Sequence, residues 1–517
     1  MKGAEALIKT LVDSGVEVCF MNPGTSEMHF VAALDRVPGM RGVLALFEGV
    51  ATGAADGYAR MTGKPASTLL HLGPGLANGL ANLHNARRGA TPVVNIVGEH
   101  ATYHKQYDAP LESDIEAIAG NVSGWIMCPR TPEQVGPDAS AAVAASYGPP
   151  GQVATLVLPA DVTWLEAGGP APPAPHAAPT EVPIERVEDV AKVMAAGETS
   201  ALLVGGSASR RDALLAAGRV AAASGAKLLA ETFPSRLERG AGLPAVERLA
   251  YLAEFILAQL DGIRNLVVVD TRTPVAFFAY PDKPSLLVPE GCTVHLLAAP
   301  GEDATGALQA LADVLGAPDE VATQPPSRPD RPTGEITAEA VANAIGALLP
   351  EGAIVSDEAN TAGLWIPAAT AGAPPHDWLC LTGGSIGQGM PVATGAAVAC
   401  PDRPVVSLEA DGSAMYTLQS LWTQAREGLD VTTVVFNNGS YAVLNLELAR
   451  VGAEPPGPQA EAMLDISHPD LDFVSLAQGM GVEASRPETM DEFCDRFAAA
   501  VAGDGPNLIE VVLPAGF

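Results

Sequence analysis

Residues 405–441 read VVSLEADGSAMYTLQSLWTQAREGLDVTTVVFNNGSY, and this stretch decides the fold class. An apolar run at 405–408 leads to Asp411, an amphipathic helical pattern follows, and a second apolar run at 431–436 leads to Asn438. Two strands joined by such a long crossover pair in parallel, so both end at the same edge of one sheet. The pattern therefore predicts that Asp411 and Asn438 lie together.

Oxygen side chains at such an edge suit a magnesium ion that carries a diphosphate. Mg²⁺ prefers oxygen ligands, and free N–H groups at a helix start bind phosphate. Asp-Gly and Asn-Gly are also the commonest hairpin turn pairs, so each pair alone favours a simple turn. Two such pairs, each closing an apolar strand with one helix between them, favour a ligand site.

Helical and strand patterns alternate along the whole chain of 517 residues. This predicts an α/β protein with three doubly wound parallel-sheet domains. Two proline-rich stretches without periodicity read as linkers. The expected layout is a first domain at 1–167, a linker at 168–183, a central domain at 184–317, a second linker at 318–335 and a third domain at 336–517.

The formal net charge is −31, and no run of lysine or arginine occurs. Because nucleic acids and anionic membranes bind basic patches, neither is an expected partner. The six cysteines show no metal-ligand spacing, and the sequence has neither a signal peptide nor an apolar run of membrane-spanning length. We therefore expect a cytoplasmic protein with reduced thiols.

The first domain offers several polar side chains at predicted strand ends. Glu48 follows the apolar run at 42–47, where it is either a helix cap or a buried carboxylate that shares a proton with a heterocyclic nitrogen. His71 ends a strand before a predicted Gly-Pro-Gly turn and is either a core or a pocket histidine. Thr25 offers a pocket hydroxyl, while His100 and His104 lie in a polar loop and are as readily exposed to solvent.

The third domain offers two further loops. Residues 356–363, reading SDEANTAG, place hydroxyl and amide groups at a helix start, which is a possible second phosphate contact. The glycine-rich stretch at 381–400 allows the backbone to approach a ligand closely, and Ile386 is the β-branched apolar side chain within its glycines. A tight turn alone would also explain those glycines.

These positions, in this order, resemble the thiamine diphosphate enzymes of the acetohydroxyacid synthase, benzoylformate decarboxylase and pyruvate oxidase group. The resemblance covers the whole chain, although the family motif GDG reads ADG here, with Ala410 before an intact Asp411. It implies a pyrimidine-binding first domain, a non-catalytic central domain and a diphosphate-binding third domain. It further implies that the cofactor lies between two subunits of a homodimer or homotetramer.

The resemblance also implies a role for each candidate. Mg²⁺ would be bound by Asp411, Asn438 and the backbone oxygen of Ser440. Glu48 would hydrogen-bond the pyrimidine ring, and Ile386 would support the bent form of the cofactor. The residues implied to approach the diphosphate are Asn360, Thr361, Gly412 and Ser413.

The implied reaction is decarboxylation of a 2-oxo acid or a related ketone substrate, which ends either in an aldehyde or in a 2-hydroxy ketone. His71 matches a proton-transfer histidine of benzoylformate decarboxylase, but residues 273–284 contain no second histidine. Glu99 replaces a common glutamine in the expected substrate pocket, which would also include Thr25, His100 and His104. FAD is not expected, since the central domain lacks clear signs of a flavin site. A non-catalytic family member and a nucleotide- or CoA-binding protein stay open as alternatives.

Overall fold

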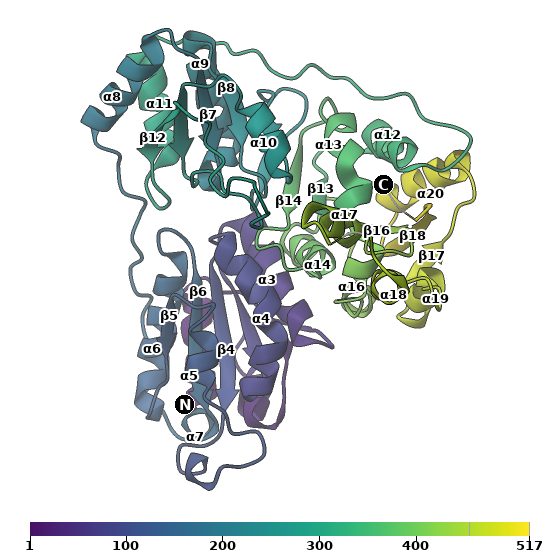
Figure 1. Cartoon of the computed structure of the whole chain (residues 1–517). Coiled ribbons are helices and arrows are strands. Elements are labelled where there is room, and N and C mark those ends of the chain that lie inside the picture. The colour runs from purple at the N-terminus through teal and green to yellow at the C-terminus, as the bar shows by residue number, and fades with distance from the viewer. Residues whose placement is uncertain (454, 516–517) are drawn as a thin grey trace.

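The chain folds into three α/β units, each built around its own sheet (Figure 1). The structure is a computed structural model that describes residues 1–453 and 455–515. In Figure 1 the first unit (purple and blue) lies below the central unit (teal), and the third unit (green to yellow) lies beside them. The predicted α/β class with three parallel-dominated sheets is confirmed.

The first unit holds six parallel strands in the order β2-β1-β3-β4-β6-β5. Its strands are β1 (Val18–Asn22), β2 (Arg41–Leu44), β3 (Ala66–Leu70), β4 (Val93–Glu99), β5 (Trp125–Met127) and β6 (Val153–Pro159). Its helices are α1 (Gly3–Asp13), η1 (Thr25–Glu27), α2 (Met28–Ala33), α3 (Glu48–Thr62), α4 (Leu72–Arg88), η2 (Lys105–Tyr107), α5 (Ile115–Ala119), α6 (Pro132–Tyr147) and α7 (Ala160–Trp164). Neighbouring residues such as Cys19 and Phe20 enter different apolar clusters, because alternate side chains of a strand face opposite sides of the sheet.

The predicted Gly-Pro-Gly turn after His71 is wrong. Residues 73–75 form the first turn of α4, and His71 is the residue that precedes the helix. Leu72 has φ of 52°, so the chain reverses within one residue and the helix starts at once. Proline is tolerated there, since the first turn of a helix does not use its N–H groups.

The central unit is a five-stranded parallel sheet in the order β10-β8-β7-β11-β12. Its strands are β7 (Ser200–Val204), β8 (Lys227–Ala230), β10 (Glu247–Arg248), β11 (Asn265–Val269) and β12 (Thr293–Ala298). Its helices are α8 (Ile184–Ala195), η3 (Gly206–Ser209), α9 (Arg211–Ser224), α10 (Ala253–Gln259) and α11 (Ala304–Val314). The short strand β10 forms one edge of this sheet.

The third unit is a seven-stranded sheet in the order β17-β18-β16-β15-β13-β14-β9. Its strands are β9 (Leu237–Arg239), β13 (Ile354–Glu358), β14 (His376–Cys380), β15 (Val405–Ala410), β16 (Val431–Asn437), β17 (Glu483–Ser485) and β18 (Asn507–Val512). Its helices are α12 (Ala338–Leu348), η4 (Asn360–Trp365), α13 (Ile366–Ala369), α14 (Gly389–Ala399), α15 (Asp411–Ala414), α16 (Ser420–Glu427), α17 (Ala442–Arg450), α18 (Pro458–Leu464), α19 (Phe473–Gly479) and α20 (Met490–Ala502).

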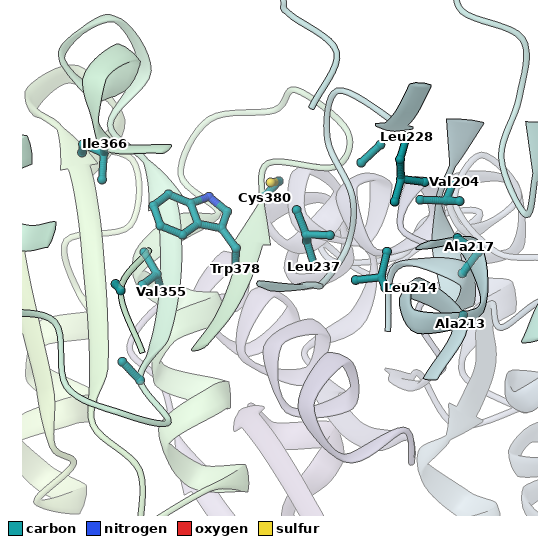
Figure 2. Close-up of a cluster of buried hydrophobic side chains, with 14 of the residues drawn as sticks. Val204, Ala213, Leu214, Ala217, Leu228, Leu237, Val355, Ile366, Trp378 and Cys380 are labelled. Atoms are coloured by element: carbon teal, nitrogen blue, oxygen red, sulfur yellow. The ribbon is translucent and has the colours of Figure 1, made fainter. Parts of the chain in front are cut away.

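Strand β9 comes from the segment that otherwise builds the central unit. It pairs antiparallel with β14 at the edge of the third sheet. Figure 2 shows the consequence: Leu237 of β9 lies between Trp378 on the third sheet and Leu214 of α9 on the central unit. The central and third units therefore share one continuous apolar core.

Helices α3 and α14 join the first and third units at close range. A Cβ atom at Gly57 would lie 2.1 Å from the backbone oxygen of Val392, and one at Gly395 would lie 1.8 Å from that of Ala54. Only glycine permits such contact between two backbones. In the part of the chain that the structure describes, no helix has the length and apolar character needed to cross a bilayer. All six cysteines are free thiols.

Candidate active site

The carboxyl ends of β15 and β16 bring Asp411 and Asn438 together, as predicted from the sequence. The two strands are parallel neighbours. One oxygen of Asp411 accepts hydrogen bonds from the backbone N–H groups of Asn438 (3.0 Å) and Gly439 (2.7 Å), and the other accepts from Gly412 N–H (2.7 Å). Burial raises the pKa of the Asp411 carboxyl, whereas the three N–H donors favour its charged form.

The donor set at this edge fits a hard cation. It consists of the Asp411 carboxylate, the Asn438 carboxamide oxygen, which accepts from Ser440 N–H at 3.1 Å, and the backbone oxygen of Ser440. Among the described residues, no three His, Cys, Asp or Glu side chains are grouped so as to hold a metal. An all-oxygen set with one carboxylate suits Mg²⁺ that also binds a diphosphate.

The predicted diphosphate contacts meet beside this site. Asn360, at the start of η4, donates from Nδ2 to the Ser413 hydroxyl at 2.9 Å, so the two loops are in contact. Asn360 is exposed, Thr361 is half-buried and Ser413 is buried. A Cβ atom at Gly412 would lie 2.4 Å from the Tyr441 ring, so a larger residue at this turn would displace that ring.

Ile386 lies half-buried in a loop that is fixed from two sides. Asn82 and Asn85 of α4 donate to the backbone oxygens of Gly387 (3.1 Å) and Ser385 (2.8 Å). On the other side, Gly387 N–H donates to Glu358 at 2.6 Å. Burial raises the pKa of Glu358 to about 7. The backbone around Ile386 is therefore rigid, which suits a side chain that has to support a ligand.

Glu48 begins α3 and is buried. Its Oε2 accepts a hydrogen bond from Asn78 Nδ2 at 3.0 Å, while Oε1 has no donor among the residues that the structure describes. A Cβ atom at Gly75 would lie 3.0 Å from Oε1 and 3.4 Å from Cβ of His71. Glu48 thus keeps one oxygen free beside His71, as a carboxylate that binds a ring nitrogen would.

His71 is hydrogen-bonded to Glu27, a residue not predicted from the sequence. His71 Nδ1 lies 2.8 Å from Glu27 Oε2, and the Glu27 side chain is fully buried. Burial raises the pKa of Glu27, and the charge of His71 opposes this. A Cβ atom at Gly98 would lie 1.6 Å from Glu27 Oε1, so the pair is tightly enclosed. The available signal was a glutamate in the loop that follows a predicted strand, five residues beyond Asn22 at the end of β1, but nothing in the sequence links it to His71.

The other predicted pocket residues lie on nearby loops of the first unit. Thr25 is exposed at the start of η1. Glu99 ends β4 and is not free, because Lys105 forms an ion pair with it and also contacts Glu112 at 2.9 Å. In the same loop, the rings of His100 and His104 lie 5.3 Å apart between centroids. The loop is therefore ordered by contacts among the residues of 98–114.

The segment at 273–284, which contains no histidine, places an aromatic ring against the loop that carries Ile386. A Cβ atom at Gly384 would lie 2.3 Å from the ring of Phe277, so this ring packs directly on the loop that carries Ile386. Phe277 also contacts Tyr251, with ring centroids 5.3 Å apart. This wall of the site is apolar and aromatic.

The site consists of two half-sites: the group around Glu48 and His71 on the first unit, and the group around Asp411 and Asn438 on the third unit. Together they define the class of protein. Residues 1–118 match the thiamine pyrophosphate enzyme N-terminal TPP binding domain, and residues 361–511 match the C-terminal TPP binding domain. The chain belongs to the thiamine pyrophosphate enzyme family. The family expectation drawn from the order of motifs is confirmed.

Three known proteins show which members of this family the chain is most usefully compared with. The chain is 61% identical over 517 residues to "Putative acetolactate synthase large subunit IlvX" of Mycobacterium tuberculosis, covering 100% of this chain and 99% of that protein. It is 28% identical to benzoylformate decarboxylase of Pseudomonas aeruginosa, covering 96% of each. The fold matches the Rhodococcus jostii RHA1 thiamine diphosphate-dependent 4-hydroxybenzoylformate decarboxylase, with a TM-score of 0.87, 23% identity and coverage of 100% and 99%. The protein is thus a thiamine diphosphate-dependent enzyme that resembles acetolactate synthase and benzoylformate decarboxylase.

Proposed function

We propose that the protein binds thiamine diphosphate with Mg²⁺ and decarboxylates a 2-oxo acid, with His71 transferring the proton that completes an aldehyde product. The observation that carries this proposal is the enclosed pair of His71 and Glu27 beside the free oxygen of Glu48. Thiamine diphosphate supplies the nucleophilic carbon and accepts the electrons released with carbon dioxide.

The residues that would hold the cofactor come from both half-sites. Asp411, Asn438 and the Ser440 backbone oxygen would bind Mg²⁺, while Asn360 and Ser413 lie where a diphosphate would contact them. Glu48 would hydrogen-bond the pyrimidine ring through its free oxygen, and Ile386 would support the bend of the cofactor. The Oε1 atom of Glu48, which has no protein donor in the described part of the chain, supports this assignment, because it is left to accept a hydrogen bond from a ligand.

His71 is suited to hold a proton at the edge of this site. Its side chain is 24% exposed, so one face reaches the solvent-accessible edge while Nδ1 contacts the buried Glu27 carboxylate. That carboxylate hydrogen-bonds Nδ1 and orients the ring, so the other ring nitrogen is the one left to exchange a proton with a bound group. Glu27 is therefore a positioning residue.

A second candidate outcome is carboligation, in which the product carbon adds to a second carbonyl compound instead of taking up a proton. The relative named acetolactate synthase, at 61% identity, favours it. The apolar wall formed by Phe277 also favours it, because this wall offers no acid group to the reacting carbon. Both outcomes share the steps up to the loss of carbon dioxide.

We further infer that the complete site forms between two subunits of a homodimer, or of a tetramer built from such dimers. Large apolar side chains are exposed on loops of the first unit and on the third unit around the proposed diphosphate contacts. These are Leu46, Tyr103 and Tyr107 on the first unit, and Leu364, Trp365 and Tyr416 on the third. Exposed apolar groups around two half-sites favour a surface that a second subunit covers.

In the central unit, two carboxylates of the protein lie against the loop that follows β7. Asp270 accepts hydrogen bonds from the N–H (2.7 Å) and hydroxyl (2.6 Å) of Ser207, and Glu231 accepts from Gly206 N–H at 3.3 Å. Burial raises the pKa of Glu231 to about 7. Carboxylates of the protein thus accept hydrogen bonds from loop N–H groups that a bound phosphate would otherwise use.

We expect the enzyme with thiamine diphosphate and Mg²⁺ to release carbon dioxide from at least one member of a panel of 2-oxo acids. The His71→Gln variant should lower kcat for aldehyde formation by about 100-fold or more, since glutamine holds no transferable proton. The measurement is carbon dioxide release together with mass detection of aldehyde and 2-hydroxy ketone products.

The matched control is His29→Gln, which changes an exposed histidine two residues from Glu27 and should retain wild-type rates. Wild-type aldehyde formation by His71→Gln would overturn the proton-transfer role. Formation of 2-hydroxy ketone alone, with unchanged rate in this variant, would select the carboligase outcome instead.

A further inference from the structure

Helix α4 presents three polar side chains to the loop that carries Ile386. The three are Asn82, His84 and Asn85, and each approaches the carbonyl oxygen of a different loop residue. The acceptors, in the same order, are Gly387 at 3.1 Å, Gly383 at 3.2 Å and Ser385 at 2.8 Å. A helix of the first unit thus holds alternate residues of a loop of the third unit, on both sides of Ile386.

Asn85 makes two contacts with a single loop residue. Its Nδ2 donates to the Ser385 carbonyl oxygen, and its Oδ1 accepts from the Ser385 N–H at 3.2 Å. Asn85 is fully buried, and the Ser385 backbone has no other hydrogen-bond partner within residues 1–453 and 455–515. A Cβ atom at Gly383 would lie 2.4 Å from Asn85 Oδ1, so the loop backbone lies directly against this carboxamide. One side chain therefore fixes both backbone polar groups of the residue before Ile386.

Asn82 connects the same loop to the start of α3. Its Nδ2 donates to the carbonyl oxygens of Gly387 and, at 2.8 Å, of Gly49, which follows Glu48 in α3. Its Oδ1 accepts from Asn85 Nδ2 at 3.1 Å, so the two carboxamides also hold each other. Asn82 is buried as well. The loop and the first turn of α3 thus share one hydrogen-bonded frame.

These two asparagines are not explained by the stability of α4. Asparagine forms helix less readily than alanine, by roughly 0.5 kcal/mol, and a buried carboxamide is costly unless its hydrogen bonds are made. The hydrogen bonds of the Asn82 and Asn85 side chains go to the loop, to each other and to Gly49, and none goes to the backbone of α4. Their polar groups therefore order the loop and not the helix that carries them.

We propose that Asn85, supported by Asn82, is a positioning residue for the reaction: it fixes the peptide before Ile386 and so sets this side chain against the bent cofactor. The inference rests on the proposed function, since it requires thiamine diphosphate to lie over Ile386. Ile386 is only half-buried, so its place depends on the backbone that carries it. A displacement of about 1 Å in such a support can lower a rate by about 100-fold.

Loss of Asn82 alone is expected to have a smaller effect. The Gly387 carbonyl oxygen also accepts from the Thr417 hydroxyl at 3.0 Å, and the Gly387 N–H donates to Glu358 at 2.6 Å. Gly387 thus keeps two other partners, unlike the residue that Asn85 fixes.

The test measures exchange of the cofactor C2 proton with deuterated water in the enzyme saturated with thiamine diphosphate and Mg²⁺. Asn85→Ala removes both contacts with Ser385, whereas Asn85→Asp keeps the shape and the acceptor but loses the donor. We expect both variants to slow the exchange and to lower kcat by about 10- to 100-fold, with KM for the 2-oxo acid changed by less than about twofold. Asn82→Ala should lower both rates by about 3- to 10-fold.

The matched control is Asn95→Ala. Asn95 is a fully buried asparagine of the same unit, and its carboxamide is hydrogen-bonded to Thr68 (2.7 Å) and Thr155 (2.9 Å) within the sheet. Because it removes buried hydrogen bonds away from the loop, this change should lower the melting temperature by an amount comparable to Asn85→Ala and leave the C2 exchange unchanged.

Normal exchange in Asn85→Ala, or equal slowing in Asn85→Ala and Asn95→Ala, would overturn the positioning role and leave the proposed function intact. If Asn85→Ala does not fold, Asn85→Asp and Asn82→Ala provide the same test, and normal exchange in both would overturn the role. Absence of C2 exchange in the wild-type enzyme would instead overturn the proposed function and this inference with it.

Discussion

Replacing Glu48 by glutamine is expected to reduce kcat by about 10²- to 10⁴-fold, because an amide cannot share a proton with the pyrimidine ring. The change is nearly isosteric, and the glutamine oxygen can still accept the hydrogen bond from Asn78. The fold and the binding of Mg²⁺ should therefore be retained. The effect should appear before substrate is involved, as slower exchange of the cofactor C2 proton with deuterated water, measured by NMR.

The matched control for this variant is Glu133→Gln. Glu133 lies in the first turn of α6 in the same unit, but it is exposed and far from any predicted role. It should leave both proton exchange and kcat unchanged. Normal C2 exchange and full activity in Glu48→Gln would contradict the proposed hydrogen bond between the Glu48 carboxylate and the pyrimidine ring.

The second large effect is expected at Asp411. Its two oxygens accept three backbone N–H groups at the ends of β15 and β16, so an amide in this place would direct an NH₂ group at one of those donors. Loss of the only carboxylate from the proposed metal set should weaken cofactor binding by at least about 100-fold, since even outer partners of metal ligands contribute 10- to 100-fold.

The measurement is a titration of the cofactor-free Asp411→Asn variant with thiamine diphosphate at fixed Mg²⁺, followed by tryptophan fluorescence. Asp402→Asn is the control, because Asp402 is exposed in the turn that leads into β15. Unchanged cofactor affinity in Asp411→Asn would contradict the assignment of Mg²⁺ to this strand edge.

The parts of the site that lie within one strand-helix-strand unit were predictable from the sequence. Asp411 and Asn438 follow two apolar runs with a helix between them. Because neighbouring parallel strands end at the same edge of the sheet, the two residues lie close together. Glu48 and His71 were also placed correctly at strand ends, since polar side chains after buried strands are easily recognised.

The contacts between segments that are distant in sequence could not be predicted. Glu27 contacts His71 because β1 and β3 are neighbours in the sheet. No local sequence pattern indicates that these two strands pair. Strand β9 has three residues, too few for a periodic signal, and it joins a sheet formed mainly by a later part of the chain.

The central claim is that Glu48 of one subunit and Asp411 of another complete the same thiamine diphosphate site. Co-expression of Glu48→Gln and Asp411→Asn chains tests it directly, because each homodimer is expected to be inactive. If the site is shared, a mixed dimer keeps one site with both residues intact, so random assortment should restore about a quarter of wild-type activity. Activity no higher than that of the two separate variants, from a sample in which mixed dimers are shown to form, would mean that both residues act within one chain and would contradict the account.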